Sequence, residues 1–279
     1  MSEPIFYING DMMKQSKANV SFNDSGFLFG DGIFETIRFT NKKLFAIEKH
    51  IERLKIGIKT IQLNDNISIE KITTLLREVL KVNNISNGLL KLILTRGELE
   101  SEPWNHNSSP SIYITIRPFK EFKNIPLKVI FLEEKDYPII RFHPAIKSMS
   151  YIGNVIAKIE AKNLNANEPV FINNQGIITE CAIRNIFFVK NNTLLTPKKE
   201  LGILPGIVRE TIIKIAKKNG METIETKIHR DTINNMDEAF LSSSGIGILP
   251  CRWKNWNSNY KYTLKLKNDL FNYIKQNSN

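Results

Sequence analysis

This chain contains few cysteines and no long apolar segment. Cys181 and Cys251 are its only cysteines, too few for the disulfide framework of a small secreted protein, so we expect a reducing compartment. No apolar run approaches the roughly 18 residues that a membrane helix needs. The N-terminal residues also lack the basic and apolar regions of a signal peptide. These absences predict a cytoplasmic protein without a membrane partner.

Acidic residues are outnumbered: 39 lysines and arginines face 28 aspartates and glutamates, which gives a formal net charge of +11. A strongly basic surface is a feature of nucleic-acid-binding proteins. Here the lysines are spread along the chain, and the densest pairs are Lys198-Lys199 and Lys217-Lys218. We therefore expect solvated lysines and no nucleic-acid partner.

The length of 279 residues allows two modest domains, each with its own core. Residues 118–126 begin and end with proline and are otherwise mostly polar or charged, a composition typical of an interdomain linker. We therefore predict an N-terminal α/β domain at 1–117 and a second domain at 127–279.

Local patterns predict a mixture of helices and strands. Apolar residues at spacings of three and four predict an amphipathic helix at 48–63 and another that follows the capping residue Ser68. Asparagine-containing turns predict hairpins at 169–179 and 185–196. Further strands are predicted at 4–9, 89–95, 111–117, 127–132, 222–226 and 238–242, and further helices at 152–164, 207–219 and 264–274.

Two residues suit a pyridoxal 5′-phosphate site. The amine of Lys147 could form a Schiff base with the cofactor aldehyde, and the carboxylate of Glu180 could hold a proton on the pyridine nitrogen. Chemistry alone does not select Lys147 from the many lysines. Tyr151, which follows Lys147, also fits a half-buried aromatic residue on the first turn of a helix.

A third segment suits a phosphate group. Residues 202–211 run Gly-Ile-Leu-Pro-Gly-Ile-Val-Arg-Glu-Thr, so that Gly206 stands at the start of a predicted helix, where backbone amides can bind an anion. The same pattern also fits a routine connection into a helix. Likewise, Arg53 fits the solvated face of a helix, and Ser243 and Ser244 fit turn caps.

The motifs together resemble the class IV (fold-type IV) aminotransferases, a family that also contains 4-amino-4-deoxychorismate lyase. The resemblance covers about residues 5–250, with its motifs in family order. They are Phe29-Gly-Asp-Gly-Ile-Phe34-Glu-Thr36-Ile-Arg38, His50-x-x-Arg53-Leu54, Thr95-Arg96-Gly97, Lys147-Ser-Met-Ser-Tyr151, Thr179-Glu180, Gly206-Ile-Val-Arg209 and Ser243-Ser244.

The resemblance implies an α/β (α+β) fold with a smaller N-terminal domain, a larger C-terminal domain that carries Lys147, and the cofactor in the interdomain cleft. It also implies a homodimer, an amino substrate and no metal. Lys147 and Thr36 would be catalytic, with Lys147 forming the Schiff base. Cofactor contacts would come from Arg53, Lys147, Tyr151, Glu180, Gly206, Ile207, Val208, Ser243 and Ser244. Substrate contacts would come from Phe29, Phe34, Arg38 and Arg96.

Within the family, Thr36 favours the lyase. Branched-chain aminotransferases usually carry glycine at this position, and D-amino-acid aminotransferases carry an Arg-x-His motif that is absent at the expected spacing after Arg96-Gly97. The family's phosphate loop usually has threonine at the position of Val208, so one hydroxyl contact is missing here. We predict lysis of 4-amino-4-deoxychorismate to 4-aminobenzoate and pyruvate; the alternative is transamination of D-amino acids or branched-chain L-amino acids. A non-catalytic binding protein is disfavoured because both Lys147 and Glu180 are present.

Overall fold

The computed structural model describes residues 3–63, 68–102, 104, 109–120 and 122–278. Its internal contacts divide the chain into two units. Unit 1 contains Met1–Lys120, Ile146–Ser150 and Asn277–Asn279, and unit 2 contains Glu121–Ala145 and Tyr151–Gln276. In the described ranges, no helix is both long enough and apolar enough to cross a membrane.

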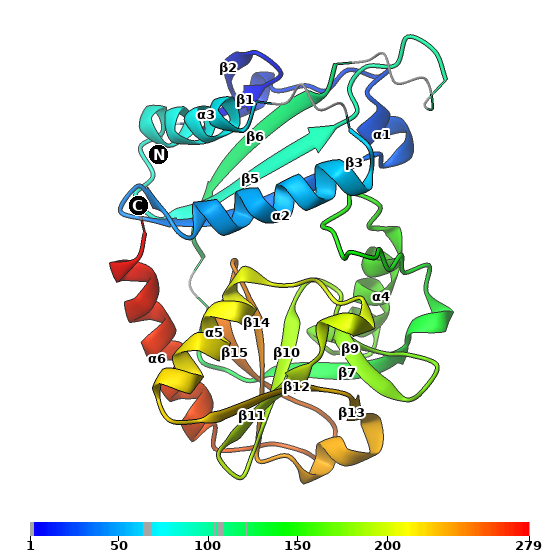
Figure 1. Ribbon diagram of the computed structural model, residues 1–279, viewed down its shortest axis with the longest axis vertical. Coiled ribbons are helices and arrows are strands. Elements are labelled where there is room, and N and C mark those ends of the chain that lie inside the picture. Colours follow the sequence, from blue (N-terminus) through cyan, green and yellow to red (C-terminus); the bar gives the residue numbers. More distant parts are fainter. Residues whose placement is uncertain (1–2, 64–67, 103, 105–108, 121, 279) are drawn as a thin grey trace. The chain divides into compact units, whose positions relative to one another are not determined.

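Unit 1 is built on a six-stranded antiparallel sheet with the order β2-β1-β6-β5-β3-β4. Helices α2 and α3 pack on one face of this sheet (Figure 1). The strands are β1 (Ile5–Ile8), β2 (Asp11–Lys14), β3 (Gly32–Thr40), β4 (Lys43–Leu44), β5 (Gly88–Thr95) and β6 (Ser111–Pro118). The helices are α1 (Ser25–Phe29), α2 (Ile47–Thr60) and α3 (Ile69–Val82), with the short 3-10 helix η1 (Gln15–Lys17).

Alternation along β3 separates the two faces of this sheet. Ile33, Glu35, Ile37 and Phe39 are buried on the face that α2 and α3 cover, so the alternating residues Phe34, Thr36 and Arg38 point to the other face. Directly paired residues of neighbouring strands share a face, which extends the second face across β5 and β6. We call it the Phe34 face; it includes Phe34, Thr36 and Arg38 of β3, Leu89, Lys91 and Ile93 of β5, and Tyr113, Thr115 and Arg117 of β6.

The segment 146–150 lies along β3, although the sequence placed it in the 127–279 domain. The backbone N–H of Phe34 donates to the carbonyl of Lys147 at 2.9 Å, and the N–H of Met149 donates to the carbonyl of Gly32 at 2.9 Å. Ser148 forms a β-bridge with Ile33. These bonds attach Lys147 to the N-terminal sheet. The predicted linker at 118–126 remains a prediction.

Unit 2 contains a nine-stranded mixed sheet with the order β12-β11-β10-β14-β15-β7-β8-β9-β13. Its strands are β7 (Leu127–Glu133), β8 (Glu168–Ile172), β9 (Ile177–Cys181), β10 (Asn185–Lys190), β11 (Thr193–Pro197), β12 (Glu222–Thr226), β13 (Ile228–His229), β14 (Glu238–Ser243) and β15 (Gly247–Arg252). Its helices are α4 (Ile152–Asn163), α5 (Ile207–Lys218) and α6 (Lys261–Gln276), with the 3-10 helices η2 (Glu134–Asp136), η3 (Lys199–Leu201) and η4 (Arg230–Asn235).

The core of unit 2 follows the same alternation. On β8, Val170 and Ile172 enter the main cluster of buried side chains, which also holds the free thiols of Cys181 and Cys251. Phe171, between them, packs with Ala157 of α4 on the other side. Helices α5 and α6 pack against strands β12, β14 and β15. The mixed α/β fold class predicted from the sequence is confirmed.

Candidate active site

Lys147 lies on the Phe34 face of unit 1. Its Nζ sits 4.3 Å from the centre of the Phe34 ring, a cation–π contact. The ammonium group of Lys91 lies 4.7 Å from the same ring centre. Because the Lys147 backbone is hydrogen-bonded to β3, its side chain is anchored close to this face. One aromatic ring thus carries two lysine ammonium groups.

Behind this face, Glu35 joins two residues of α2. Its carboxylate accepts hydrogen bonds from Arg53 Nε at 2.8 Å and from Arg53 Nη2 at 2.7 Å, and it lies 2.7 Å from His50 Nδ1. Burial alone would raise the pKa of Glu35, but Arg53 and His50 lower it to about 2. Burial lowers the pKa of His50 despite its contact with Glu35. Arg53 is therefore a buried, paired cation and not part of a solvated helix face.

Two predicted substrate-binding residues lie elsewhere in unit 1. Arg96 donates from Nε to Asp31 at 2.6 Å and from Nη2 to the carbonyl of Ile61 at 2.8 Å. Its guanidinium thus links the end of β5 to the end of α2 and stabilises the packing of these elements. Phe29 is the last residue of α1 and is 59% exposed. The structure does not bring either of them into the group around Lys147.

Thr36 and Arg38 do share the Phe34 face with Lys147. Thr36 pairs directly with Lys91 across β3 and β5. The Arg38 guanidinium lies 4.0 Å above the ring of Phe119, and burial lowers its pKa. The predicted catalytic residue Thr36 and the predicted substrate-binding residue Arg38 therefore lie on the same sheet face as Lys147.

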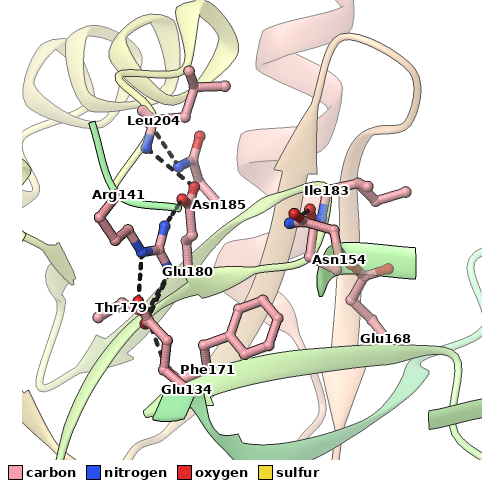
Figure 2. A network of polar contacts seen from close by, with 11 residues as sticks. Glu134, Arg141, Asn154, Glu168, Phe171, Thr179, Glu180, Ile183, Asn185 and Leu204 are labelled. Carbon is pink, nitrogen blue, oxygen red and sulfur yellow. Dashed lines mark hydrogen bonds and ion pairs between the residues drawn. The ribbon is translucent and has the colours of Figure 1, made fainter. Parts of the chain in front are cut away.

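In unit 2, Glu180 lies on β9 and is held on both carboxylate oxygens (Figure 2). Its Oε1 accepts a hydrogen bond from Arg141 Nη1, and its Oε2 accepts one from the backbone N–H of Leu204 at 3.2 Å. The side chain is partly buried. A carboxylate in such a setting requires a positive or donating partner, and Arg141 provides it.

Arg141 lies between two carboxylates (Figure 2). Its Nε donates to Glu134 Oε1 at 2.7 Å, and its Nη2 donates to Glu134 Oε2 at 3.0 Å and to Thr179 Oγ1 at 3.2 Å. Burial alone would lower the pKa of Arg141, but Glu180 and Glu134 raise it above its ordinary value. The guanidinium is therefore a permanent cation that fixes the orientation of Glu180.

The start of α5 has the form expected of an anion site. Gly206 is the N-cap, and no side chain caps the first turn, which leaves its amides available to a ligand. Asn185 Nδ2 donates to the carbonyl of Leu204 at 3.0 Å and so holds the preceding loop. A Cβ at position 206 would lie 2.1 Å from Asn185 Oδ1, so this position requires glycine. Ile207 and Val208 follow as buried residues of the first turn.

The remaining predicted cofactor residues also lie in unit 2. Tyr151 is the N-cap of α4; burial raises its pKa to about 12, and the charge of Glu180 adds to the shift. Ser243 is the last residue of β14, and Ser244 lies in the turn that follows it. Asn154 Nδ2 donates to the carbonyl of Ala182 at 2.7 Å and ties α4 to the turn after β9 (Figure 2).

The structure thus gathers the predicted residues into two groups. Unit 1 holds Lys147 with Phe34, Thr36 and Arg38, and unit 2 holds the remaining cofactor residues apart from Arg53. Sequence reasoning missed the roles of Glu35 and Arg141. Glu35 lies between Ile33 and Ile37 on the same buried face of the strand. A carboxylate is unusual at such a position, and this could have indicated a buried cation as its partner. Nothing in the local sequence connects Arg141 to Glu180.

Comparison with known proteins gives a consistent family. The model of a family described as "Amino-transferase class IV" matches residues 32–253. A protein of Methanocaldococcus jannaschii named "Putative branched-chain-amino-acid aminotransferase" is 32% identical over 247 residues, covering 88% of this chain and 85% of that protein. The D-alanine aminotransferase of Staphylococcus epidermidis is 35% identical over 251 residues, covering 88% and 86%.

Solved structures agree with this fold. The branched-chain aminotransferase of Thermoproteus uzoniensis with norvaline has a TM-score of 0.89 at 23% identity and covers 99% of this chain and 96% of that one. A T.th. branched-chain aminotransferase, solved with pyridoxamine 5′-phosphate, has a TM-score of 0.86 at 20% identity, with coverage of 99% and 96%. A Legionella pneumophila protein named "Putative 4-amino-4-deoxychorismate lyase" has a TM-score of 0.82 at 25% identity, with coverage of 95% and 97%.

Proposed function

Because this chain belongs to the class IV aminotransferases, we propose that it transfers an amino group between an amino acid and a 2-oxo acid with pyridoxal 5′-phosphate bound to Lys147. The observation that carries the proposal is the position of Lys147. Its backbone is hydrogen-bonded to β3, and its Nζ lies 4.3 Å from the centre of the Phe34 ring.

The residues present fit the cofactor in chemistry. Unit 1 supplies the amine of Lys147, and unit 2 supplies the carboxylate of Glu180 and an uncapped helix start at Gly206. A Cβ at Gly206 would meet the side chain of Asn185, so the fit to a phosphate rests on the uncapped amides of the helix start. When bound, the cofactor supplies an electron sink for the substrate carbon.

Each residue then has a proposed task. Lys147 Nζ takes the proton from the substrate carbon and later returns it. Glu180 would hold a proton at the ring nitrogen, and Tyr151 would contact the phenolic oxygen. The phosphate would be held by Arg53, by the amides after Gly206 at Ile207 and Val208, and by Ser243 and Ser244.

The proposed donors are D-alanine-like amino acids and branched-chain L-amino acids, because relatives more than 30% identical are named for both. The lyase is a second candidate, because Thr36 lies on the same face as Lys147 and a solved structure at 25% identity is named for that activity. Both reactions need Lys147 and Glu180, so the substrate decides between them.

We also propose a homodimer in the cytoplasm. Helix α4 exposes an apolar stripe, formed by Ile152, Val155, Ile156 and Ile159, which are 62%, 46%, 42% and 54% exposed. Exposed apolar patches of this kind mark protein interfaces. Light scattering of the wild type and of Ile159→Asp tests the dimer: we expect the wild type to be dimeric and the variant to dissociate. A monomeric, fully active wild type would overturn the dimer.

A product assay tests the proposed function. The holoenzyme is given D-alanine, L-leucine and other amino acids with a 2-oxo acid acceptor, and separately 4-amino-4-deoxychorismate. We expect a 2-oxo acid product from at least one amino acid donor. Release of fluorescent 4-aminobenzoate without transamination of any donor would replace the aminotransferase with the lyase.

A further inference from the structure

A groove runs along helix α4 of unit 2, and we call it the α4 groove. Its volume is about 470 Å³, which lies in the range of small-molecule sites, roughly 300–1,000 Å³. Part of its wall is apolar, from Val155 and Ile159 of α4 and from Ile183 after β9. Lys158 and Lys162 also line it and lie one helical turn apart. The groove therefore combines an apolar surface with two cations.

Lys158 is anchored in the α4 groove by a buried carboxylate. Its Nζ donates to Glu168 Oε2 at 2.9 Å and to the carbonyl of Asn167 at 2.7 Å. A lysine ammonium group has a third N–H to donate, and 32% of the Lys158 side chain is exposed. The position of Nζ is thus fixed by the fold, and one of its donors remains for a ligand.

Glu168 has to balance two cations. Arg184 Nη1 donates to the same Oε2 atom as Lys158, so these three side chains together carry one net positive charge. Burial lowers the pKa of Lys158 to about 8, and the charge of Arg184 adds to the shift. Burial also lowers the pKa of Arg184 to about 10. Both cations have therefore lost water without gaining a full counter-charge.

We propose that the α4 groove binds a small organic anion, a monocarboxylate with an apolar chain. The carboxylate accepts a charge-assisted hydrogen bond from Lys158 Nζ and supplies the missing charge, with Lys162 as a second cation at the rim. The chain lies against Ile159 and Ile183 and is removed from water. Among the described residues that line the groove, none is acidic, so no carboxylate of the protein competes with the ligand.

The α4 groove borders the stripe that we assign to the dimer interface. Val155 and Ile159 belong to both, whereas Ile152 and Ile156 do not line the groove. Tyr151 lines the groove as well, so a bound anion lies close to a residue of the proposed cofactor site. The inference needs neither the proposed reaction nor the dimer, because every contact that it uses lies within unit 2.

Calorimetry tests the site with octanoate as the probe. Octanoate, acetate and octylamine are titrated into the holoenzyme, which separates the effect of the apolar chain from that of the head-group charge. We expect octanoate to bind more tightly than acetate, and octylamine not to bind. Lys158→Met should weaken octanoate binding about 10-fold, the effect of losing a charge-assisted bond. Ile183→Asp, which places a carboxylate in the groove, should abolish it, and Lys217→Met, at an exposed position of α5, is the matched control.

Lys162→Met keeps the test decisive if Lys158→Met does not fold, because Lys162 is exposed; it should also weaken octanoate binding, by a smaller factor. Equal octanoate affinities for the wild type and Ile183→Asp would place the probe elsewhere and overturn the site. A wild type that does not bind octanoate would also overturn it, and dissociation of the dimer by Ile183→Asp would then assign the groove to a second copy of the chain. Failure of transamination leaves the result expected for octanoate unchanged.

Discussion

Arg53 on α2 donates two hydrogen bonds to Glu35 on β3, from Nε at 2.8 Å and from Nη2 at 2.7 Å. Both side chains are buried, and His50 lies on the same carboxylate at 2.7 Å. Because two of its nitrogen atoms donate to Glu35, the guanidinium of Arg53 cannot rotate into solvent. Glu35 therefore fixes the orientation of Arg53, the residue of unit 1 that we assign to the cofactor phosphate.

Loss of the Glu35 charge should destabilise the protein. Glu35→Gln leaves Arg53 buried without its counter-charge, which costs about 3–5 kcal/mol in comparable buried pairs. We expect a clear fall in the thermal midpoint at pH 7, measured by calorimetry. Glu52→Gln, at an exposed position on α2, should leave the midpoint nearly unchanged. Equal midpoints for the two variants would contradict the role of the pair.

The same substitution should have an effect that depends on pH. The pKa of Glu35 is lowered from 4.5 to about 2 in the folded protein, so its contribution to stability is complete above pH 4.5 and is lost as the pH falls towards 2. His50, whose folded-state pKa is lowered, also weakens the fold as the pH falls below 6.5. The difference in thermal midpoint between wild type and Glu35→Gln should therefore shrink between pH 4.5 and pH 2. A difference that grows on acidification would contradict this account.

Arg141 should act on the rate through Glu180. Glu180→Ala should keep the visible cofactor band but lower kcat about 10²-fold, the range of a positioned proton-holding group. Arg141→Met should lower kcat about 10-fold, since it removes one charge-assisted bond worth roughly 1.5 kcal/mol. If Arg141 works by orienting Glu180, the double variant should be no slower than Glu180→Ala alone. Fully additive losses would show that Arg141 has a separate task.

Thr36 separates the two candidate reactions. It lies on the Phe34 face opposite Lys91, where a hydroxyl could assist elimination but is not needed for transamination. Thr36→Val should leave transamination and the cofactor absorbance nearly unchanged. If the enzyme is a lyase, the same variant should release 4-aminobenzoate about 10²-fold more slowly. Equal loss of both activities would make Thr36 a structural residue of the strand.

Much of the fold could be predicted from local patterns. Ser68 accepts a hydrogen bond from the N–H of Lys71 as the cap of α3, and Gly220, with φ +75°, follows α5 as expected. Strand β15 was not predicted, because Pro250 lacks the N–H that a central strand uses; here it pairs with Phe240 inside the sheet. Strand β2 was missed because all of its residues are exposed or half-buried, so no apolar alternation marks it.

The candidate site was predictable only in part. Motif order indicated Lys147, Glu180 and Gly206, because these residues stand within short segments of the chain. The partners of Glu180 come from distant segments, and no spacing in the sequence connects them. The attachment of Lys147 to β3 depends on two backbone hydrogen bonds and one β-bridge. Such contacts produce no periodic pattern in the amino-acid sequence from which they could be predicted. Tertiary contacts of this kind become visible only in the folded chain.

The most direct test of the account is to locate the cofactor on the chain. The holoenzyme is reduced with borohydride, which makes the cofactor–lysine bond permanent. The protein is then digested, and the masses of its peptides are measured by mass spectrometry. Lys91 serves as an internal control for the choice of lysine, because its Nζ lies over the same Phe34 ring as the Nζ of Lys147. We expect the added mass on the peptide that contains Lys147, and none in the Lys147→Ala variant after dialysis. Labelling of Lys91 or of any other lysine in the wild type would contradict it.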